Sequence, residues 1–270
     1  MGMQMLLIVT GASKGLGKAI TTGFCCMDSS EQQRQQLDRL HVVLAARSAN
    51  LLEELGRTIM HHNESTKVRV TLSCFAVDLS DLDQLDSHFD RMFQEVNLSG
   101  FDRVVFVNNA GSLGYLGPCS SSPSLTGMKA TIDFNVTSAL WLSSRFAQLV
   151  QENSNPDTQK VTLINISSLL AVEAFPTMGI YAAGKAARDN YHATMAKEMP
   201  RIKVLNYAPG PLETDMVEEI RAAPKLDKSL KPAFDKKLID PQDSAKKLVD
   251  LVFSDKFESG SHVDYYDISS

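Results

Sequence analysis

Short apolar segments alternate with longer segments of helical periodicity along the whole chain. The apolar segments have the length of β-strands and contain few residues that need to face water. They are Met5–Val9, His41–Ala46, Val68–Val77, Val104–Val107, Lys160–Ile166, Ile202–Tyr207 and a short last one near His262–Tyr266. Strands of this composition are typical of parallel sheets that helices cover on both faces. The pattern therefore predicts an α/β fold with one doubly wound parallel sheet of about seven strands.

Helices are expected between these strands, where apolar residues recur at helical spacing. They are Gly15–Cys26, Ala49–His61, Leu82–Val96, Leu125–Val150, Ile180–Met199 and Pro241–Phe253. No linker interrupts the alternation, so we expect a single domain over residues 1–270. The charged stretch from 212 to 240 leaves two interpretations open, a lid over a substrate site or a solvated insertion.

The composition excludes several classes of protein. Of 270 residues, 43% are hydrophobic and 22% are charged, as in ordinary globular proteins. The net charge of -5 is spread along the chain, so no basic surface is expected to bind nucleic acid or anionic lipid. No apolar stretch approaches the length of a membrane span. Four cysteines without metal-ligand or disulfide spacing, and no signal-peptide pattern, indicate a cytoplasmic protein with reduced thiols.

A glycine-rich loop follows the first predicted strand and precedes the first predicted helix. Residues 10–17 read Thr-Gly-Ala-Ser-Lys-Gly-Leu-Gly, and glycine lets the backbone turn sharply and approach a pyrophosphate at the helix N-terminus. The spacing differs from the common G-x-G-x-x-G pattern and lacks the Lys-Ser/Thr ending of a P-loop. The place of this loop between a strand and a helix nevertheless predicts a Rossmann-like, dinucleotide-binding domain. The expected contacts are Gly11, Ser13, Lys14, Gly15, Leu16 and Gly17.

The end of the second predicted strand distinguishes between the two nicotinamide dinucleotides. NAD-binding domains commonly place a carboxylate there to bind the adenosine ribose. This chain has Arg47-Ser48 instead, and a guanidinium suits the 2′-phosphate of NADP(H). Lys14 adds a second positive charge, so the expected cofactor is NADPH or NADP.

Two further strand ends carry residues that we expect beside the cofactor. Asp78 and Leu79 follow the third strand, near the expected place of the adenine. Asn109, Ala110 and Gly111 follow the fourth strand. For both sets, the alternative interpretation is a turn that caps the next helix.

The strongest chemical signal is the pair of Tyr181 and Lys185. An i, i+4 pair on a helix projects both side chains from one face, and a cation beside a phenol lowers the pKa of that phenol. Ser168 follows the strand Lys160–Ile166, at the edge where open α/β sheets bind ligands. We predict that Tyr181 exchanges a proton with a substrate oxygen held by Ser168, and that Lys185 tunes Tyr181.

These motifs together resemble the short-chain dehydrogenase/reductase family. The resemblance covers nearly the whole chain, through the glycine loop, Asn108–Gly111, the serine before Tyr-x-x-x-Lys, and Pro209-Gly210. It implies carbonyl reduction by NADPH, with Asn135 as a fourth catalytic residue whose backbone holds a water, and with Lys185 also binding the nicotinamide ribose. The resemblance also implies a homodimer formed through the two long helices expected at Leu125–Val150 and Ile180–Met199. Further cofactor contacts are implied at Leu212, Thr214, Asp215, Met216 and Val217.

Several stretches resemble, more narrowly, the members of the family that reduce pterins. They are residues 165–169, 181–189, 205–212 with 214–216, and 259–267. This implies a pterin substrate whose side-chain ketone is reduced, bound by Ser168, Tyr181, Gly210 and Asp264. A pterin presents its 2-amino group and ring N3–H side by side, and the carboxylate of Asp264 could accept both hydrogen bonds.

Three alternatives stay open. A reductase of the same fold could act on steroids, quinones or xenobiotic carbonyls, because an apolar pocket rejects near-isosteres poorly. A non-catalytic NADP(H)-sensing protein could use the same domain to regulate a partner, although it would not need the intact set of Ser168, Tyr181 and Lys185. Asp264 could be an exposed residue without a binding role.

Overall fold

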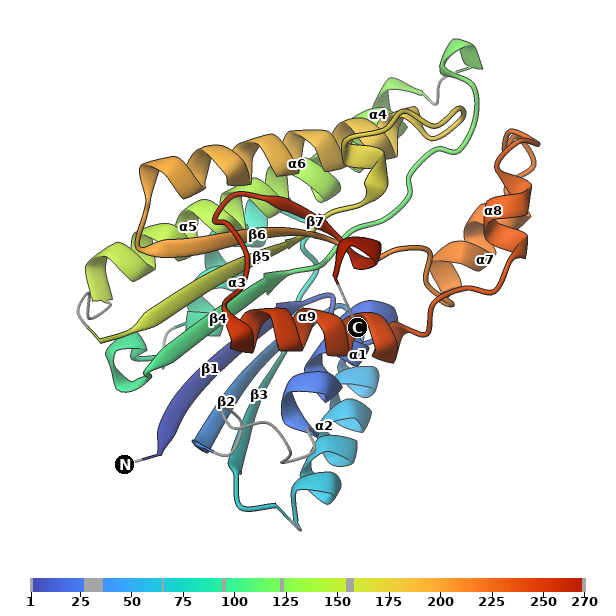
Figure 1. The fold of residues 1–270 in the computed structure, drawn as a ribbon. Helices are drawn as coiled ribbons and strands as arrows, with labels where there is room; N and C mark the ends of the chain where they lie inside the picture. Colours follow the sequence, from blue (N-terminus) through green and yellow to red (C-terminus); the bar gives the residue numbers. More distant parts are fainter. Residues whose placement is uncertain are drawn as a thin grey trace.

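The computed structural model describes residues 2–26, 36–64, 66–93, 96–121, 124–153 and 158–268, and in these ranges seven strands form one sheet (Figure 1). Their order is β3-β2-β1-β4-β5-β6-β7, and every neighbouring pair is parallel. They are β1 (Met3–Thr10), β2 (Leu37–Ala46), β3 (Arg69–Ala76), β4 (Arg103–Asn108), β5 (Lys160–Ile166), β6 (Ile202–Ala208) and β7 (His262–Asp264). The predicted doubly wound α/β fold is confirmed.

Helices cover both faces of this sheet (Figure 1). They are α1 (Gly15–Cys25), α2 (Ala49–Asn63), α3 (Leu85–Phe93), α4 (Leu125–Ile132), α5 (Ser138–Asn153), α6 (Gly179–Glu198), α7 (Asp215–Ala222), α8 (Lys231–Asp235) and α9 (Pro241–Ser254). One apolar core joins α1, α2 and α9 to the sheet, and a second core joins α3, α5 and α6 to the opposite face. Alternate residues of β1 enter different cores, Leu7 the first and Leu6 the second, which explains why the strand is apolar throughout.

The strand order determines where a ligand can bind. From β1 the chain continues to β2 and β3 on one side, and from β4 onward it builds the other side of the sheet. The order therefore reverses between β1 and β4, and open α/β sheets bind ligands outside the carboxyl ends of the strands at such a point. The glycine loop and residues 109–111 follow these two strands.

The long helix expected at Leu125–Val150 is divided. A π-helical turn, Asp133–Thr137, lies between α4 and α5, and α5 continues to Asn153. Asn135 belongs to this turn, where its side chain donates to the carbonyl of Ser112 and accepts from the N–H of Ser112, both at 2.8 Å. Apolar periodicity does not reveal such a turn, because one extra residue in a helix leaves the spacing of the apolar residues around it nearly unchanged.

The bounds of α3 and of the last strand also differ from expectation. The segment expected as a helix from Leu82 to Val96 begins with a 3-10 turn, Leu82–Gln84, and α3 ends at Phe93. The last strand ends at Asp264 rather than Tyr266. There the Asp264 carboxylate accepts from the N–H of Tyr266 at 2.9 Å and Asp267 accepts from the N–H of Asp264 at 3.2 Å, so a reciprocally capped turn replaces the strand.

The charged stretch from 212 to 240 is packed against the rest of the molecule. Its apolar side chains Val217, Ile220, Leu230 and Phe234 are buried in a third core. This core also contains Tyr181, so the stretch covers the region of the expected catalytic tyrosine. Because these side chains are buried, the interpretation of the stretch as a solvated insertion does not apply to them. Movement of the stretch as a lid stays a prediction.

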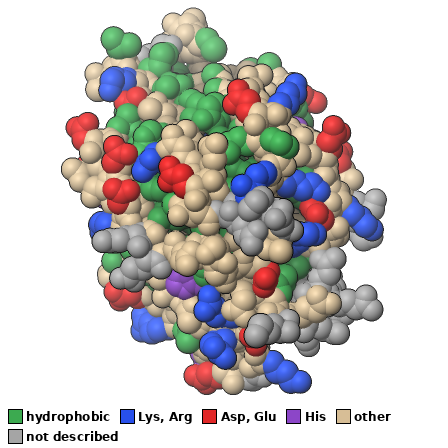
Figure 2. Space-filling model, turned by 90° about the vertical axis from the view of Figure 1, so that its left-hand side faces the viewer, with side chains coloured by type: hydrophobic (Ala, Val, Ile, Leu, Met, Phe, Trp, Pro, Cys, Tyr) green, Lys and Arg blue, Asp and Glu red, His purple; other side chains and the backbone are tan. Residues whose placement is uncertain are grey.

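The distribution of charged side chains on the surface and the hydropathy of the helices agree with the expectations drawn from the composition. Acidic and basic side chains are interspersed on the face shown in Figure 2. In the part of the chain that the structure describes, no helix has both the length and the apolar composition needed to cross a bilayer. Among the described residues, Cys25, Cys26, Cys74 and Cys119 form no disulfide bond.

His192 on α6 is a fully buried histidine on the side of the sheet that α3, α5 and α6 cover. Its Nδ1 donates to the carbonyl of Arg188 at 2.7 Å, and its Nε2 accepts from the hydroxyl of Ser143 at 2.8 Å. Burial, together with the nearby charge of Arg188, lowers the pKa of His192 to about 3. The imidazole is therefore neutral in the folded protein at every pH above that value.

This neutral histidine should make folding sensitive to mild acid. Between pH 7 and pH 5 we expect His192 to reduce the free energy of unfolding by about 2 kcal/mol, because the unfolded chain takes up a proton near ~6.5 that the folded chain does not accept. His192→Gln keeps a donor and an acceptor but does not titrate, so it should lose about 2 kcal/mol less between these pH values. Urea unfolding of both proteins at pH 7 and pH 5 measures the difference. Equal losses would contradict a neutral buried imidazole.

Candidate active site

The glycine loop joins β1 to α1 through backbone conformations that favour glycine. Gly11 has a φ of 64° and Gly15 a φ of 52°, both in the left-handed region. At Gly17 the constraint is space, because a Cβ there would collide with the carbonyl oxygen of Gly11 and lie 2.6 Å from Nδ2 of Asn109. No side chain caps the start of α1 at Lys14. The first N–H groups of this helix are therefore suited to a phosphate.

Thr10 and Asn109 fasten the ends of β1 and β4 together. The Thr10 hydroxyl accepts from the backbone N–H of Asn109 at 3.0 Å and of Ala110 at 3.1 Å. The Asn109 side chain donates to the carbonyls of Thr10 and Gly11 at 2.9 and 3.2 Å. Asn109 and Ala110, which were expected beside the cofactor, thus support the glycine loop directly. Gly111, the next residue, is half-buried.

The residues expected near the adenosine follow β2 and β3. Arg47 is exposed, and Ser48 caps the N-terminus of α2. Asp78 accepts two hydrogen bonds from Ser80, which is the turn role left open by the sequence, and Leu79 is buried. Although burial opposes the shift, the pKa of Asp78 is lowered, because Ser80 donates to its carboxylate and Arg47 supplies positive charge nearby.

Two of the expected cofactor contacts form an ion pair with each other. Nζ of Lys14 lies 2.8 Å from the Asp215 carboxylate, with 63% and 79% of the two side chains exposed. Such an exposed pair adds little stability, but it connects the glycine loop to the start of α7. The remaining contacts expected in this segment are buried or half-buried beside it: Leu212, Thr214, Met216 and Val217.

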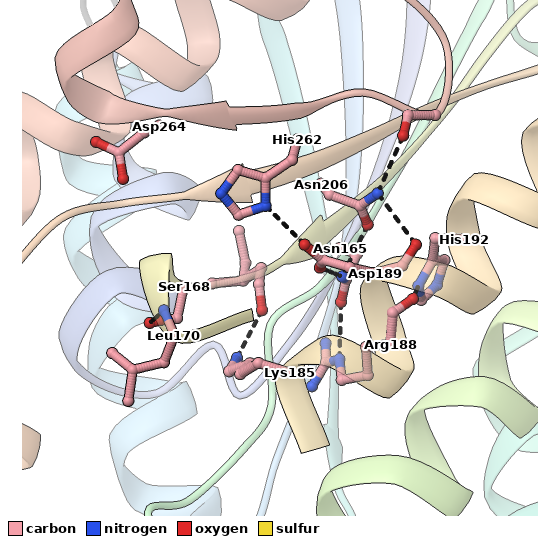
Figure 3. Close-up of polar contacts among 12 residues, drawn as sticks. Asn165, Ser168, Leu170, Lys185, Arg188, Asp189, His192, Asn206, His262 and Asp264 are labelled. Carbon is pink, nitrogen blue, oxygen red and sulfur yellow. Dashed lines mark hydrogen bonds and ion pairs between the residues drawn. The ribbon is translucent and has the colours of Figure 1, made fainter. Parts of the chain in front are cut away.

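Ser168, Tyr181 and Lys185 come together at the carboxyl end of β5. Tyr181 and Lys185 lie on α6, with the Lys185 Nζ 5.6 Å from the centre of the Tyr181 ring. Lys185 donates to the carbonyl of Ile166 at 2.6 Å, at the end of β5 (Figure 3). Ser168 caps the turn that follows this strand and hydrogen-bonds with Tyr181. The two hydroxyls therefore share the place where a substrate oxygen would bind.

Burial dominates the electrostatics of this group. It raises the pKa of the Tyr181 phenol, while the charge of Arg188 and the hydrogen bond with Ser168 act in the opposite direction. Burial, and then the charge of Arg188, lower the pKa of Lys185 well below its usual value, while Asp189 opposes this shift. This differs from the expectation that Lys185 lowers the pKa of Tyr181, because the cation that acts on the phenol is Arg188. Tyr181 is thus a protonated phenol at neutral pH.

Asn135 connects the π-helical turn to the same region. It is 6% exposed, and its side-chain oxygen would lie 3.4 Å from a Cβ at Gly111. A Cβ at Gly184, directly before Lys185, would lie 3.7 Å from the Cβ of Asn135. Asn135 is therefore packed between the segment after β4 and α6.

Arg188 is the functional residue that the sequence reasoning missed. It is 1% exposed, and its guanidinium donates to three acceptors, of which Figure 3 shows Asn165. These are the carbonyl of Asn108 at 2.6 Å, the carbonyl of Ala110 at 3.0 Å and the side-chain oxygen of Asn165 at 2.7 Å. Burial lowers its pKa to about 10, so it remains a cation. The available signal was its position three residues after Lys185, on the same side of the helix.

The residues expected to bind a substrate lie at the same edge of the sheet. Asp264 ends β7, and its carboxylate oxygen Oδ1 caps the turn Tyr265–Asp267. Gly210 follows β6 with a φ of 77°, and a Cβ there would collide with Ile239 and lie 3.7 Å from the Cβ of Tyr265. Gly210 and the capped turn are therefore neighbours, which fits a shared role for Gly210 and Asp264.

The pattern of the short chain dehydrogenases matches residues 5–225, and the chain belongs to that family of oxidoreductases. It is 34% identical over 272 residues to the sepiapterin reductase of Bos taurus, covering 98% of this chain and 95% of that protein. It is 32% identical over 271 residues to the sepiapterin reductase of Xenopus tropicalis, covering 98% and 97%. A solved 7α-hydroxysteroid dehydrogenase, complexed with NADH and 7-oxo glycochenodeoxycholic acid, has a similar fold with a TM-score of 0.75, at 21% identity and coverage of 98% and 94%.

Gly17→Ala should damage the glycine loop through the collision described above. We expect a loss of about 1–3 kcal/mol in unfolding free energy, since the facing backbone must move. We also expect a fall of about tenfold or more in affinity for NADPH, measured by calorimetry. Gly23→Ala on the same helix is the matched control, because its Cβ would meet Val249 at an ordinary 3.4 Å. Equal behaviour of the two variants would argue against a space requirement at Gly17.

Proposed function

We propose that this protein is an NADPH-dependent reductase of pterin side-chain ketones, acting on 6-pyruvoyl-tetrahydropterin and sepiapterin in the synthesis of tetrahydrobiopterin. The observation that carries the proposal is the group of half-buried Ser168 with buried Tyr181 and Lys185, at the same sheet edge as the glycine loop and Asp264. Full-length similarity to sepiapterin reductases supports the choice of a pterin.

The residues after β1 and β2 fit NADP(H). The uncapped start of α1 would bind the pyrophosphate, and Gly11, Gly15 and Gly17 would let it approach the backbone. Arg47 is exposed where NAD-binding domains place a carboxylate, and it would bind the 2′-phosphate together with Lys14. Lys14 would then exchange its partner Asp215 for the phosphate.

The side chains of the site would supply the proton and the orientation. When bound, the reduced nicotinamide supplies a hydride to the carbonyl carbon, and the ketone becomes an alcohol as NADPH becomes NADP. Tyr181 donates its phenolic proton to the carbonyl oxygen, while Ser168 holds that oxygen by a hydrogen bond. Burial keeps Tyr181 protonated for this step. Lys185 and Asn135 would lie on the path by which Tyr181 regains a proton.

Asp264 would orient the pterin. One carboxylate oxygen already accepts from Tyr266, so the pterin would approach the carboxylate from its remaining side. The 2-amino and N3–H groups form a donor pair that matches a carboxylate, as a guanidinium does. Gly210 would contribute backbone contacts, and the charged stretch from 212 to 240, whose apolar side chains pack near Tyr181, would close over the ring as a lid.

We also infer a cytoplasmic homodimer. α5 and α6 border a shared groove lined by polar and apolar side chains, among them Gln148, Tyr191 and Met199, and this groove supports packing with a second copy.

NADPH consumption with sepiapterin tests the proposed function. We expect turnover with NADPH and much weaker turnover with NADH, because Arg47 replaces the carboxylate that NADH requires. Tyr181→Phe should reduce kcat about 100- to 10,000-fold and leave NADPH binding within about twofold. Turnover of simple ketones or steroids in preference to sepiapterin would favour a broad carbonyl reductase. A lack of NADPH oxidation across a carbonyl panel would favour a non-catalytic sensor.

Asp264→Asn separates pterin binding from helix capping. Asn caps a helical turn about as well as Asp, but it lacks the charge that the pterin donors need. We expect the KM for sepiapterin to rise about 10- to 100-fold, with the KM for NADPH almost unchanged. Equal effects on both ligands in steady-state kinetics would contradict the anchor.

A further inference from the structure

The last strand of the sheet carries Asp264 but is short. β7 has three residues at the sheet edge, and it pairs with β6 in a register from Asn206↔His262 to Ala208↔Asp264. Backbone pairing over so few residues is weak by itself. The position of Asp264 therefore depends on what the side chains of β7 contact.

His262 makes a strong contact with the catalytic helix. Its Nδ1 lies 2.6 Å from Oδ2 of Asp189, and 20% and 12% of the two side chains are exposed. The other oxygen of Asp189 accepts from Nδ2 of Asn165 at 3.0 Å, which holds the carboxylate in place (Figure 3). A short charge-assisted hydrogen bond that is mostly shielded from water is stronger than an exposed ion pair.

The pair links the two halves of the proposed site. Tyr181, Lys185 and Asp189 are spaced by four residues on α6, so their side chains lie along one face of that helix. His262 and Asp264 are two residues apart on β7, so they face the same side of the sheet. One ion pair thus joins the strand of the substrate anchor to the helix face of the proton donor.

The charges around His262 favour its protonated form. Its pKa is raised, first by the hydrogen bond to Asp189, which outweighs partial burial, and further by the negative charges of Asp189, Asp264 and Asp267. The pair is therefore ionic at low pH and loses its charge as the pH rises through the folded pKa of His262.

We propose that Asp189 and His262 are positioning residues that hold β7 on α6 and so set the place of Asp264 relative to Tyr181. Neither residue contacts the pterin, and together they control its affinity. This inference rests on the proposed function, because the pterin gives the Asp264 carboxylate its task.

Steady-state kinetics of His262→Gln with sepiapterin and NADPH between pH 6 and pH 9 test the proposal. We expect the KM for sepiapterin at pH 6 to rise about tenfold, while kcat and the KM for NADPH stay within about twofold. In the wild type the KM for sepiapterin should rise with pH, as His262 loses its proton. In His262→Gln the KM for sepiapterin should no longer depend on pH in this way. A merely structural role of His262 would leave the pH dependence of this KM unchanged.

Asp189→Asn is a second variant of nearly identical shape. The double variant should have the same KM as either single variant, because both changes remove one interaction. His61→Gln is the matched control, since His61 lies 3.7 Å from Glu64 in an ion pair with 88% and 76% of the side chains exposed. Its kinetic constants should equal those of the wild type.

The outcomes separate this inference from the proposed function. If Asp264→Asn raises the KM for sepiapterin but His262→Gln and Asp189→Asn change neither the KM nor its pH profile, the positioning role is wrong. If Asp264→Asn has no effect either, the pterin anchor itself is wrong, and the inference falls with it. Hydrogen exchange at residues 262–264 reads the docking of β7 without substrate and should be faster in both variants.

Discussion

The buried guanidinium of Arg188 is the contact on which the geometry of the site depends most. It holds the end of β4, the segment after it and the end of β5 to one point on α6, through the acceptors of Asn108, Ala110 and Asn165. A buried cation that loses its partners is very costly, so α6 cannot shift against the strand ends without a large loss of stability. Tyr181 is carried on the same helix and is fixed by the same contact.

The same cation also influences the proton chemistry. Lys185 lies in the same buried region as Arg188, and burial, followed by the charge of Arg188, lowers the pKa of Lys185. The phenol of Tyr181 stays protonated because burial outweighs the effect of Arg188. Negative charge that develops on an oxygen beside Tyr181 would nevertheless be stabilised by a cation that needs no reorganisation. The site therefore combines the proposed proton donor with a fixed positive charge.

The parts of the site that could be predicted follow local rules. The glycine loop, the strand ends and the pair of Tyr181 and Lys185 each depend on residues close together in the chain. Arg188 could not be given its role in this way, because its three acceptors lie 23 to 80 residues away. The pairing of His262 with Asp189 spans 73 residues, and neither side chain carries a motif that announces the other.

The sequence by itself determined the parallel sheet, its helices and the edge at which ligands bind, because alternation, periodicity and glycine spacing are short-range properties. Only the tertiary structure decided that Asp133–Thr137 is a π-helical turn, that β7 ends in a capped turn at Asp264, and that the apolar residues of 212–240 are buried near Tyr181. It also decided the pKa values of Tyr181 and Lys185. Burial and hydrogen-bond partners come from segments that meet only when the chain folds, so no local pattern contains them.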